Sequence, residues 1–105
     1  MKKFEILDCT FRDGGYYTNW NFSQNLAEEY FRTVSKLPIS IIELGYLSKK
    51  NDLNGPFYHM NENLLSKAKQ ILRKNQKIYA MINFKEIKKT TDLNQLLEKN
   101  YKFLD

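Results

Sequence analysis

The sequence predicts an α/β fold in which strands and helices alternate and the strands run parallel. Its 105 residues, 42% of them apolar and 14% aromatic, are enough for one modest core. Three short, nearly continuous apolar runs are typical of strands that are buried on both faces of a parallel sheet. The runs begin 35 and 38 residues apart, which fits successive strand–helix units. We therefore expect one domain over residues 1–105, with the order strand–helix repeated three times.

The three predicted strands cover residues 4–9, 39–45 and 77–84. The first is followed by a segment with two glycines, which we expect to be a loop. The second is rich in β-branched residues, as strands commonly are. The third ends at Asn83 and Phe84, close to the start of the next helical pattern.

Helices are predicted for residues 23–36, 61–74 and 92–100, where apolar residues recur at helical spacing. Ser23 is the expected N-cap of the first helix, and Pro38 ends it. Asn61 introduces the second helix, and Thr91 or Asp92 caps the third. The apolar stripes are Leu26, Tyr30, Phe31, Val34 and Leu37, then Leu64, Leu65, Ala68, Ile71 and Leu72, then Leu93, Leu96, Leu97 and Tyr101.

The last five residues, 101–105, resemble the approach to a fourth strand. An open sheet of three strands has unpaired edges. Pairing of these edges between copies is therefore a predicted form of self-association.

Composition excludes several classes of protein. No apolar run approaches the ~20 residues of a membrane span, and the N-terminus does not resemble a secretory signal. The single cysteine, Cys9, cannot form an internal disulfide, and we expect a cytoplasmic protein in which Cys9 is a small core residue. The net charge of +5 arises after residue 60, where ten basic residues face five acidic ones. Solvated helix faces explain this excess better than nucleic acid does, but a small basic module that binds anions or nucleic acid remains an alternative.

The segment Leu7–Tyr17 carries the most specific pattern. A buried strand ends there and is followed by adjacent Arg12 and Asp13, at the edge where ligands bind in parallel α/β folds. Aspartate is a hard oxygen ligand for Mg²⁺ or Mn²⁺, and arginine can hold a carboxylate or an enolate oxygen. A purely structural Arg–Asp pair is the equally weighted alternative.

Glu43 stands inside the apolar run of the second strand. A carboxylate in such a run is costly unless it is paired, and Arg12, at the end of the neighbouring strand, is the natural partner. We therefore expect Arg12, Asp13 and Glu43 to converge at one edge of the sheet.

The segment Asp8–Gly15 resembles the first-strand signature Asp-x-Thr-Leu-Arg-Asp-Gly of the DRE-TIM metallolyases. This superfamily includes 3-hydroxy-3-methylglutaryl-CoA lyase, 4-hydroxy-2-oxovalerate aldolase and the pyruvate carboxyltransferase domain. Residues 42–46 are similar to its second-strand motif Ile-Glu-Val-Gly-Phe. The resemblance implies the first three to four strand–helix units of a TIM (β/α)₈ barrel, and hence an incomplete barrel.

By position, the resemblance makes Asp13 a metal ligand, Arg12 the group that binds the substrate carboxylate or enolate, and Glu43 the residue that orients Arg12. It implies C–C cleavage or condensation of 2-oxo acids with Mn²⁺ or Mg²⁺ as cofactor. The family's His-x-His ligands have no counterpart, since His59 is the sole histidine, and we expect it to be an ordinary loop residue. We therefore expect weak or absent metal binding and an inactive chain, whether it is a truncated remnant, a fragment or one piece of a split barrel.

Two further residues are candidates for substrate contact. Tyr16 occupies the position at which the aldolase subgroup carries a histidine base, and neutral tyrosine is a poor base near neutral pH. Asn83 ends the third strand at the predicted site, where it either contacts substrate or terminates the strand.

Overall fold

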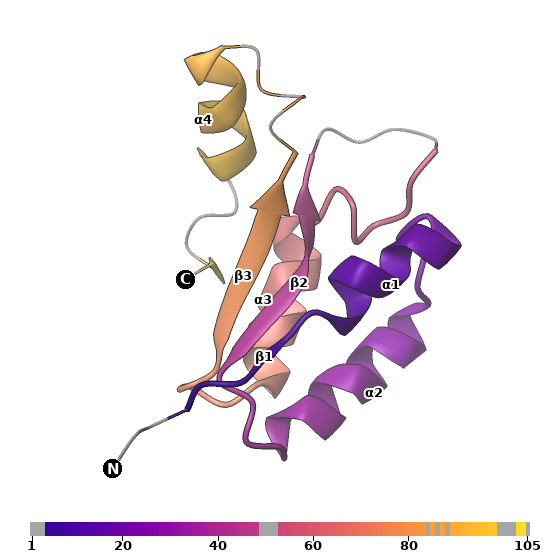
Figure 1. The fold of residues 1–105 in the computed structure, drawn as a ribbon, viewed down its shortest axis with the longest axis vertical. Coiled ribbons are helices and arrows are strands. Elements are labelled where there is room, and N and C mark those ends of the chain that lie inside the picture. Colours follow the sequence, from indigo (N-terminus) through magenta and orange to yellow (C-terminus); the bar gives the residue numbers. More distant parts are fainter. Residues whose placement is uncertain are drawn as a thin grey trace.

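The fold is described from a computed structural model, which covers residues 4–48, 53–83, 85, 87, 89–98 and 103–104. Figure 1 shows the chain as alternating strands and helices around a small sheet. The elements in order are β1 (Leu7–Asp8), α1 (Thr10–Thr18), α2 (Gln24–Ser35), β2 (Ile41–Leu47), α3 (Glu62–Ile71), β3 (Lys77–Ile82) and α4 (Thr90–Glu98).

The three strands form one open parallel sheet in the order β1-β2-β3. Leu7 lies opposite Ile41, and Ile41 lies opposite Lys77 on the other side. The predicted α/β class with parallel strands is confirmed, and the first two predicted strands are neighbours. None of the helices in the described part of the chain is long and apolar enough to cross a membrane.

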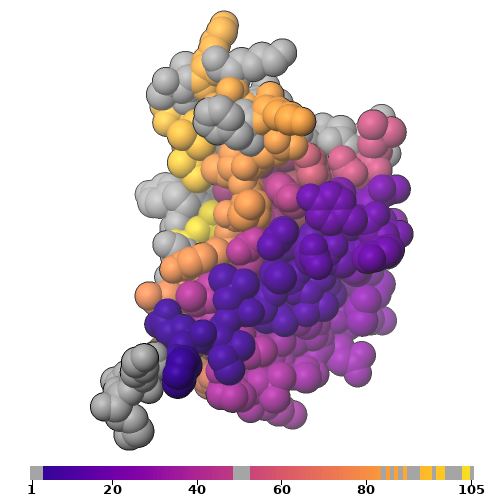
Figure 2. All heavy atoms as spheres, viewed as in Figure 1, coloured from indigo at the N-terminus to yellow at the C-terminus, as the bar shows by residue number. Residues whose placement is uncertain are grey.

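Two helices cover one face of the sheet. α2 and α3 contact each other and enclose the fully buried side chains of Phe31, Ile42, Leu65 and Ile78. On the other face Leu7, Tyr79 and Met81 stay more than one third exposed. α1 packs against β2, and in Figure 2 the indigo atoms of the N-terminal segment form a diagonal band across the molecule.

Two of the predicted helix starts are confirmed. The Ser23 side chain accepts a hydrogen bond from the Leu26 N–H at 3.1 Å, and Asn61 accepts one from the Leu64 N–H at 3.0 Å. The third prediction was wrong, because α4 already begins at Thr90 and includes Thr91 and Asp92. Residues 99 and 100, the predicted end of that helix, lie outside the described residues.

The segment after the first strand differs most from prediction. β1 ends at Asp8, and the expected glycine loop is helix α1. The Asp8 carboxylate accepts hydrogen bonds from the Thr10 N–H and hydroxyl at 3.2 and 2.9 Å, so it satisfies a free donor of the helix start. Cys9 is therefore the N-cap residue of α1 and half-buried, not a core residue of a strand.

Residues 101–105 were expected to lead into a fourth strand, and the structure describes only part of this segment. Tyr101, Lys102 and Asp105 lie outside the described residues. Phe103 and Leu104 are not in a strand, and both pack against the core as partly buried side chains.

Candidate functional site

Arg12 on α1 and Glu43 on β2 form the predicted ion pair. Arg12 Nε lies 2.7 Å from Glu43 Oε1, and the two side chains are 25% and 13% exposed. Neither atom has a hydrogen-bond partner of good angle, so the contact is an ion pair and not a linear hydrogen bond. Attraction between the opposite charges therefore supplies most of the interaction.

The remaining nitrogens of Arg12 are available to a ligand. Within the described part of the chain, the two Nη atoms make no hydrogen bond or ion pair, and they are not fully buried. Burial is the largest single influence and acts to lower the pKa of Arg12, but Glu43, with smaller contributions from Cys9 and Tyr46, raises the pKa overall. The guanidinium thus presents a fixed positive charge and free donors at the carboxyl end of β1.

Asp13, the predicted metal ligand, does not join this pair. Asp13 is exposed, and among the described residues no hydrogen bond or ion pair joins its carboxylate to Arg12 or Glu43. In the same part of the chain, no group of three or more His, Cys, Asp or Glu side chains could hold a metal ion. The described residues therefore do not by themselves form a complete site for Mn²⁺ or Mg²⁺.

Tyr16 contacts β2 one helical turn beyond Arg12. Its hydroxyl lies 3.2 Å from the Tyr46 hydroxyl, and either oxygen could be the donor. Tyr16 is 62% exposed, whereas Tyr46 is only 8% exposed. Burial, followed by the hydrogen bond with Tyr16, raises the pKa of Tyr46 to about 12.

A break in the register of β2 brings Tyr46 to this face. Glu43 pairs with Tyr79, but Gly45 pairs with Ala80 and Tyr46 with Met81, so one extra residue lies between Glu43 and Gly45. Tyr79 and Met81 share a face of β3, and therefore Glu43 and Tyr46 share a face of β2. Strict alternation would have placed them on opposite faces, so Tyr46 was not among the predicted site residues.

Trp20 fixes α1 in place. Its indole N–H donates to the Arg12 carbonyl at 2.9 Å, and its ring packs edge-on against Tyr16 and Tyr46. Asn19 and Trp20 have φ of 55° and 57°, an uncommon left-handed backbone that folds the chain back onto the helix. The indole fills the space beside Gly15, which is why that position lacks a side chain.

Asn83 and His59 are both engaged within the chain. The Asn83 side-chain amide donates to the Tyr58 hydroxyl at 3.3 Å, and its carbonyl accepts from the Lys85 N–H at 3.1 Å. The second bond closes a turn directly after β3. His59 Nε2 lies 3.0 Å from the Asn54 carbonyl oxygen in the loop after β2, as an ordinary loop histidine would.

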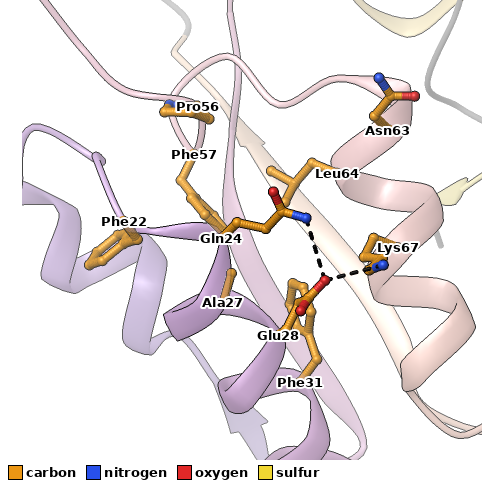
Figure 3. Close-up of a pocket in the computed structure, with 10 residues that line it drawn as sticks. All are labelled: Phe22, Gln24, Ala27, Glu28, Phe31, Pro56, Phe57, Asn63, Leu64 and Lys67. Carbon is orange, nitrogen blue, oxygen red and sulfur yellow. Dashed lines mark hydrogen bonds and ion pairs between the residues drawn. The ribbon is translucent and has the colours of Figure 1, made fainter.

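A pocket of about 400 Å³ lies elsewhere, between α2 and α3. Figure 3 shows Gln24 and Lys67 both pointing toward Glu28, at 3.5 and 3.1 Å. The bond with Lys67 is the main reason why the pKa of Glu28 is lowered. None of the predicted site residues lines this pocket, and Glu28 already pairs with Gln24 and Lys67. The lining residues are Phe22, Gln24, Ala27, Glu28, Phe31, Pro56, Phe57, Asn63, Leu64 and Lys67.

Comparison with known proteins gives one informative similarity. No protein-family model matches the chain, and no curated protein matches its sequence at a significant level. A crystal structure of the N-terminal domain of a candidate aldolase from Bacteroides vulgatus is 37% identical, with a TM-score of 0.88. The match covers 97% of this chain and 33% of that one, so this chain spans about a third of its relative's length. The chain is thus similar in sequence and fold to the N-terminal domain of that protein.

Proposed function

We propose that this chain contributes the N-terminal part of a (β/α)₈-barrel aldolase or lyase, which cleaves or forms C–C bonds of 2-oxo acids through an enolate. The observation that carries the proposal is the Arg12–Glu43 pair, with its free guanidinium donors at the carboxyl end of β1. The likeness to the N-terminal domain of a candidate aldolase supports it. The carboxyl ends of parallel strands are also where barrel enzymes carry their chemistry.

In this proposal Arg12 holds the substrate carboxylate or the developing enolate oxygen through its Nη atoms. Glu43 keeps the guanidinium oriented, because its carboxylate contacts Nε and leaves the outer nitrogens free. A fixed cation at that point stabilises the negative charge that forms during enolisation.

Asp13 is proposed as one ligand of a divalent metal ion, Mn²⁺ or Mg²⁺. A single exposed carboxylate leaves most of the coordination to water, so it would bind the ion weakly. The other ligands would have to come from outside the described residues, and we propose that the isolated chain is inactive.

Pyruvate binding tests the role of Arg12. Trp20 is the sole tryptophan, so its indole N–H gives one NMR signal at the site. We expect pyruvate to shift this signal, and the Arg12→Gln variant to bind at least tenfold more weakly, because a charge-assisted contact is lost. Arg32→Gln, on the exposed surface of α2, is the matched control and should bind like the wild type. Unchanged binding by Arg12→Gln would overturn the proposal.

The inactivity of the isolated chain is tested separately. In D₂O with Mn²⁺, the pyruvate methyl protons should exchange no faster with the chain than with Mn²⁺ alone. Faster exchange that depends on Arg12 would show that these residues suffice for enolisation.

A further inference from the structure

Two side-chain contacts, an ion pair and a pair of hydroxyl groups, join α1 to β2, and their residues occur in the same order along the helix and along the strand. Arg12 and Tyr16 are four residues apart and so lie on one face of the helix. Glu43 and Tyr46 are three residues apart and share one face of the strand because of the irregular register between Glu43 and Gly45. The ion pair and the hydroxyl pair are therefore adjacent, one helical turn apart.

Burial determines which hydroxyl donates. Tyr46 is almost fully enclosed, and a buried hydroxyl proton needs an acceptor within the protein. Tyr16 Oη, 3.2 Å away, is the acceptor that the structure offers. Because Tyr16 is largely exposed, its own proton then points away from Tyr46 and is available to a ligand. The raised pKa of Tyr46 keeps it a donor across the neutral range.

Trp20 holds the pair in position. Trp20 packs against both tyrosine rings and also binds the Arg12 backbone, so one side chain holds the arginine and the tyrosines in register. A donor that is held in place loses little conformational entropy when it binds a ligand.

We propose that Tyr46 is a positioning residue that orients the Tyr16 hydroxyl to donate to the 2-oxo oxygen of a ligand whose carboxylate is bound by Arg12. This inference rests on the proposed function and adds to it a specificity element: recognition of the carbonyl oxygen beside the carboxylate. A plain carboxylic acid offers Arg12 the same charge but gives Tyr16 no acceptor.

The experiment compares pyruvate with propanoate, which has the same charge and lacks the 2-oxo group, through the Trp20 indole NMR signal. We expect the wild-type chain to bind pyruvate about fivefold more tightly, the effect of one neutral hydrogen bond. The Tyr16→Phe and Tyr46→Phe variants should lose this preference and keep propanoate affinity. Tyr17→Phe, which removes a hydroxyl from a residue of the same helix that is 92% exposed, is the matched control and should retain the preference.

The double variant separates positioning from a merely structural role. If Tyr46 acts through Tyr16, Tyr46→Phe should change the pyruvate preference no further in a Tyr16→Phe background. Additive losses would overturn the inference, as would a preference for pyruvate that survives Tyr16→Phe. Equal binding of pyruvate and propanoate by the wild type would overturn the inference while leaving the anion site of Arg12 standing. Absence of any binding would overturn the proposed function, and the inference with it.

Discussion

At the residue scale, Arg12 and Glu43 depend on one another. Both side chains are mostly withdrawn from solvent, and their only strong contact in the described chain is the ion pair. The attraction between two such charges is only slightly larger than the free energy lost when both are withdrawn from water. Replacing both residues by apolar ones therefore costs little, whereas removing one leaves the other charge buried without a partner. This makes the pair more important for the orientation of Arg12 than for net stability.

We predict that Arg12→Met lowers the free energy of unfolding by roughly 2 kcal/mol, because it leaves the Glu43 carboxylate buried without a counter-charge. The double variant Arg12→Met with Glu43→Leu should recover most of this loss. Urea denaturation of the wild type and the variants measures both effects. An equally unstable double variant would show that packing, and not charge, accounts for the loss.

A second residue-scale prediction concerns Gln76, the one buried polar side chain in the described core. Its amide donates to the carbonyls of Val34 and Ile39 at 2.9 and 3.0 Å, and its oxygen accepts from the Arg73 N–H at 2.9 Å. Gln76→Leu should destabilise the chain by about 2 kcal/mol or more, since these groups lose their partners. Gln70→Leu, on the exposed side of α3, should change stability by no more than about 0.5 kcal/mol in the same denaturation measurement.

At the element scale, α1 is the unusual helix. It is nine residues long, contains two adjacent glycines and places both the ion pair and the hydroxyl pair on β2. Glycine is a poor helix former, so tertiary contacts must stabilise this segment. The carboxylate of Asp8, which also accepts a hydrogen bond from the Tyr30 hydroxyl, and the indole of Trp20 provide them.

The two glycines should respond in opposite ways to alanine. A Cβ at Gly15 would lie 2.0 Å from the buried Trp20 ring, whereas at Gly14 the nearest atom is 4.0 Å away. We predict that Gly15→Ala destabilises by about 1–3 kcal/mol through overpacking. Gly14→Ala should stabilise by up to about 1 kcal/mol through helix propensity. Thermal unfolding followed by circular dichroism checks both, and equal shifts for the two would contradict the packing of Trp20 on Gly15.

At the scale of the whole molecule, stability should decline at alkaline pH. The pKa of Tyr46 is raised to about 12, and burial with a hydrogen bond to Asp8 raises that of Tyr30 as well. Above pH ~10 the unfolded chain releases protons that the folded chain retains, so the free energy of unfolding falls as pH rises. Tyr46 alone should contribute on the order of 2 kcal/mol to the decline between pH ~10 and 12.

Denaturation curves at several pH values measure this decline, and Tyr46→Phe isolates one contribution to it. Above pH ~10 the free energy of unfolding of the variant should fall less steeply than that of the wild type. The lysines also lose protons in this range, but they are the same in both proteins. Identical profiles would mean that Tyr46 titrates normally.

The open sheet also predicts association of the whole molecule. Beside the two-residue strand β1, Phe4, Ile6 and Leu7 are 84%, 48% and 44% exposed, an apolar edge that no helix or strand of the described residues covers. We expect the sedimentation coefficient to increase with protein concentration, and Ile6→Lys to reduce that increase. A monomer at all concentrations would contradict pairing through this edge.

The sequence by itself determined the three parallel strands, the helix that precedes or follows each of them apart from α1, two of the helix starts and the meeting of Arg12 with Glu43. These features follow from local periodicity, capping residues and the rule that consecutive parallel strands end at one edge of a sheet. Only the tertiary structure decided that the glycine segment is helical and that Tyr46 faces the same side as Glu43. The first depends on Asp8 and on Trp20 returning to Gly15, and the second on a register irregularity against β3. Neither the side-chain contacts of Asp8 and Trp20 with α1 nor the pairing of β2 with the distant strand β3 leaves a periodic trace in the sequence, and this is the physical reason that prediction stopped there.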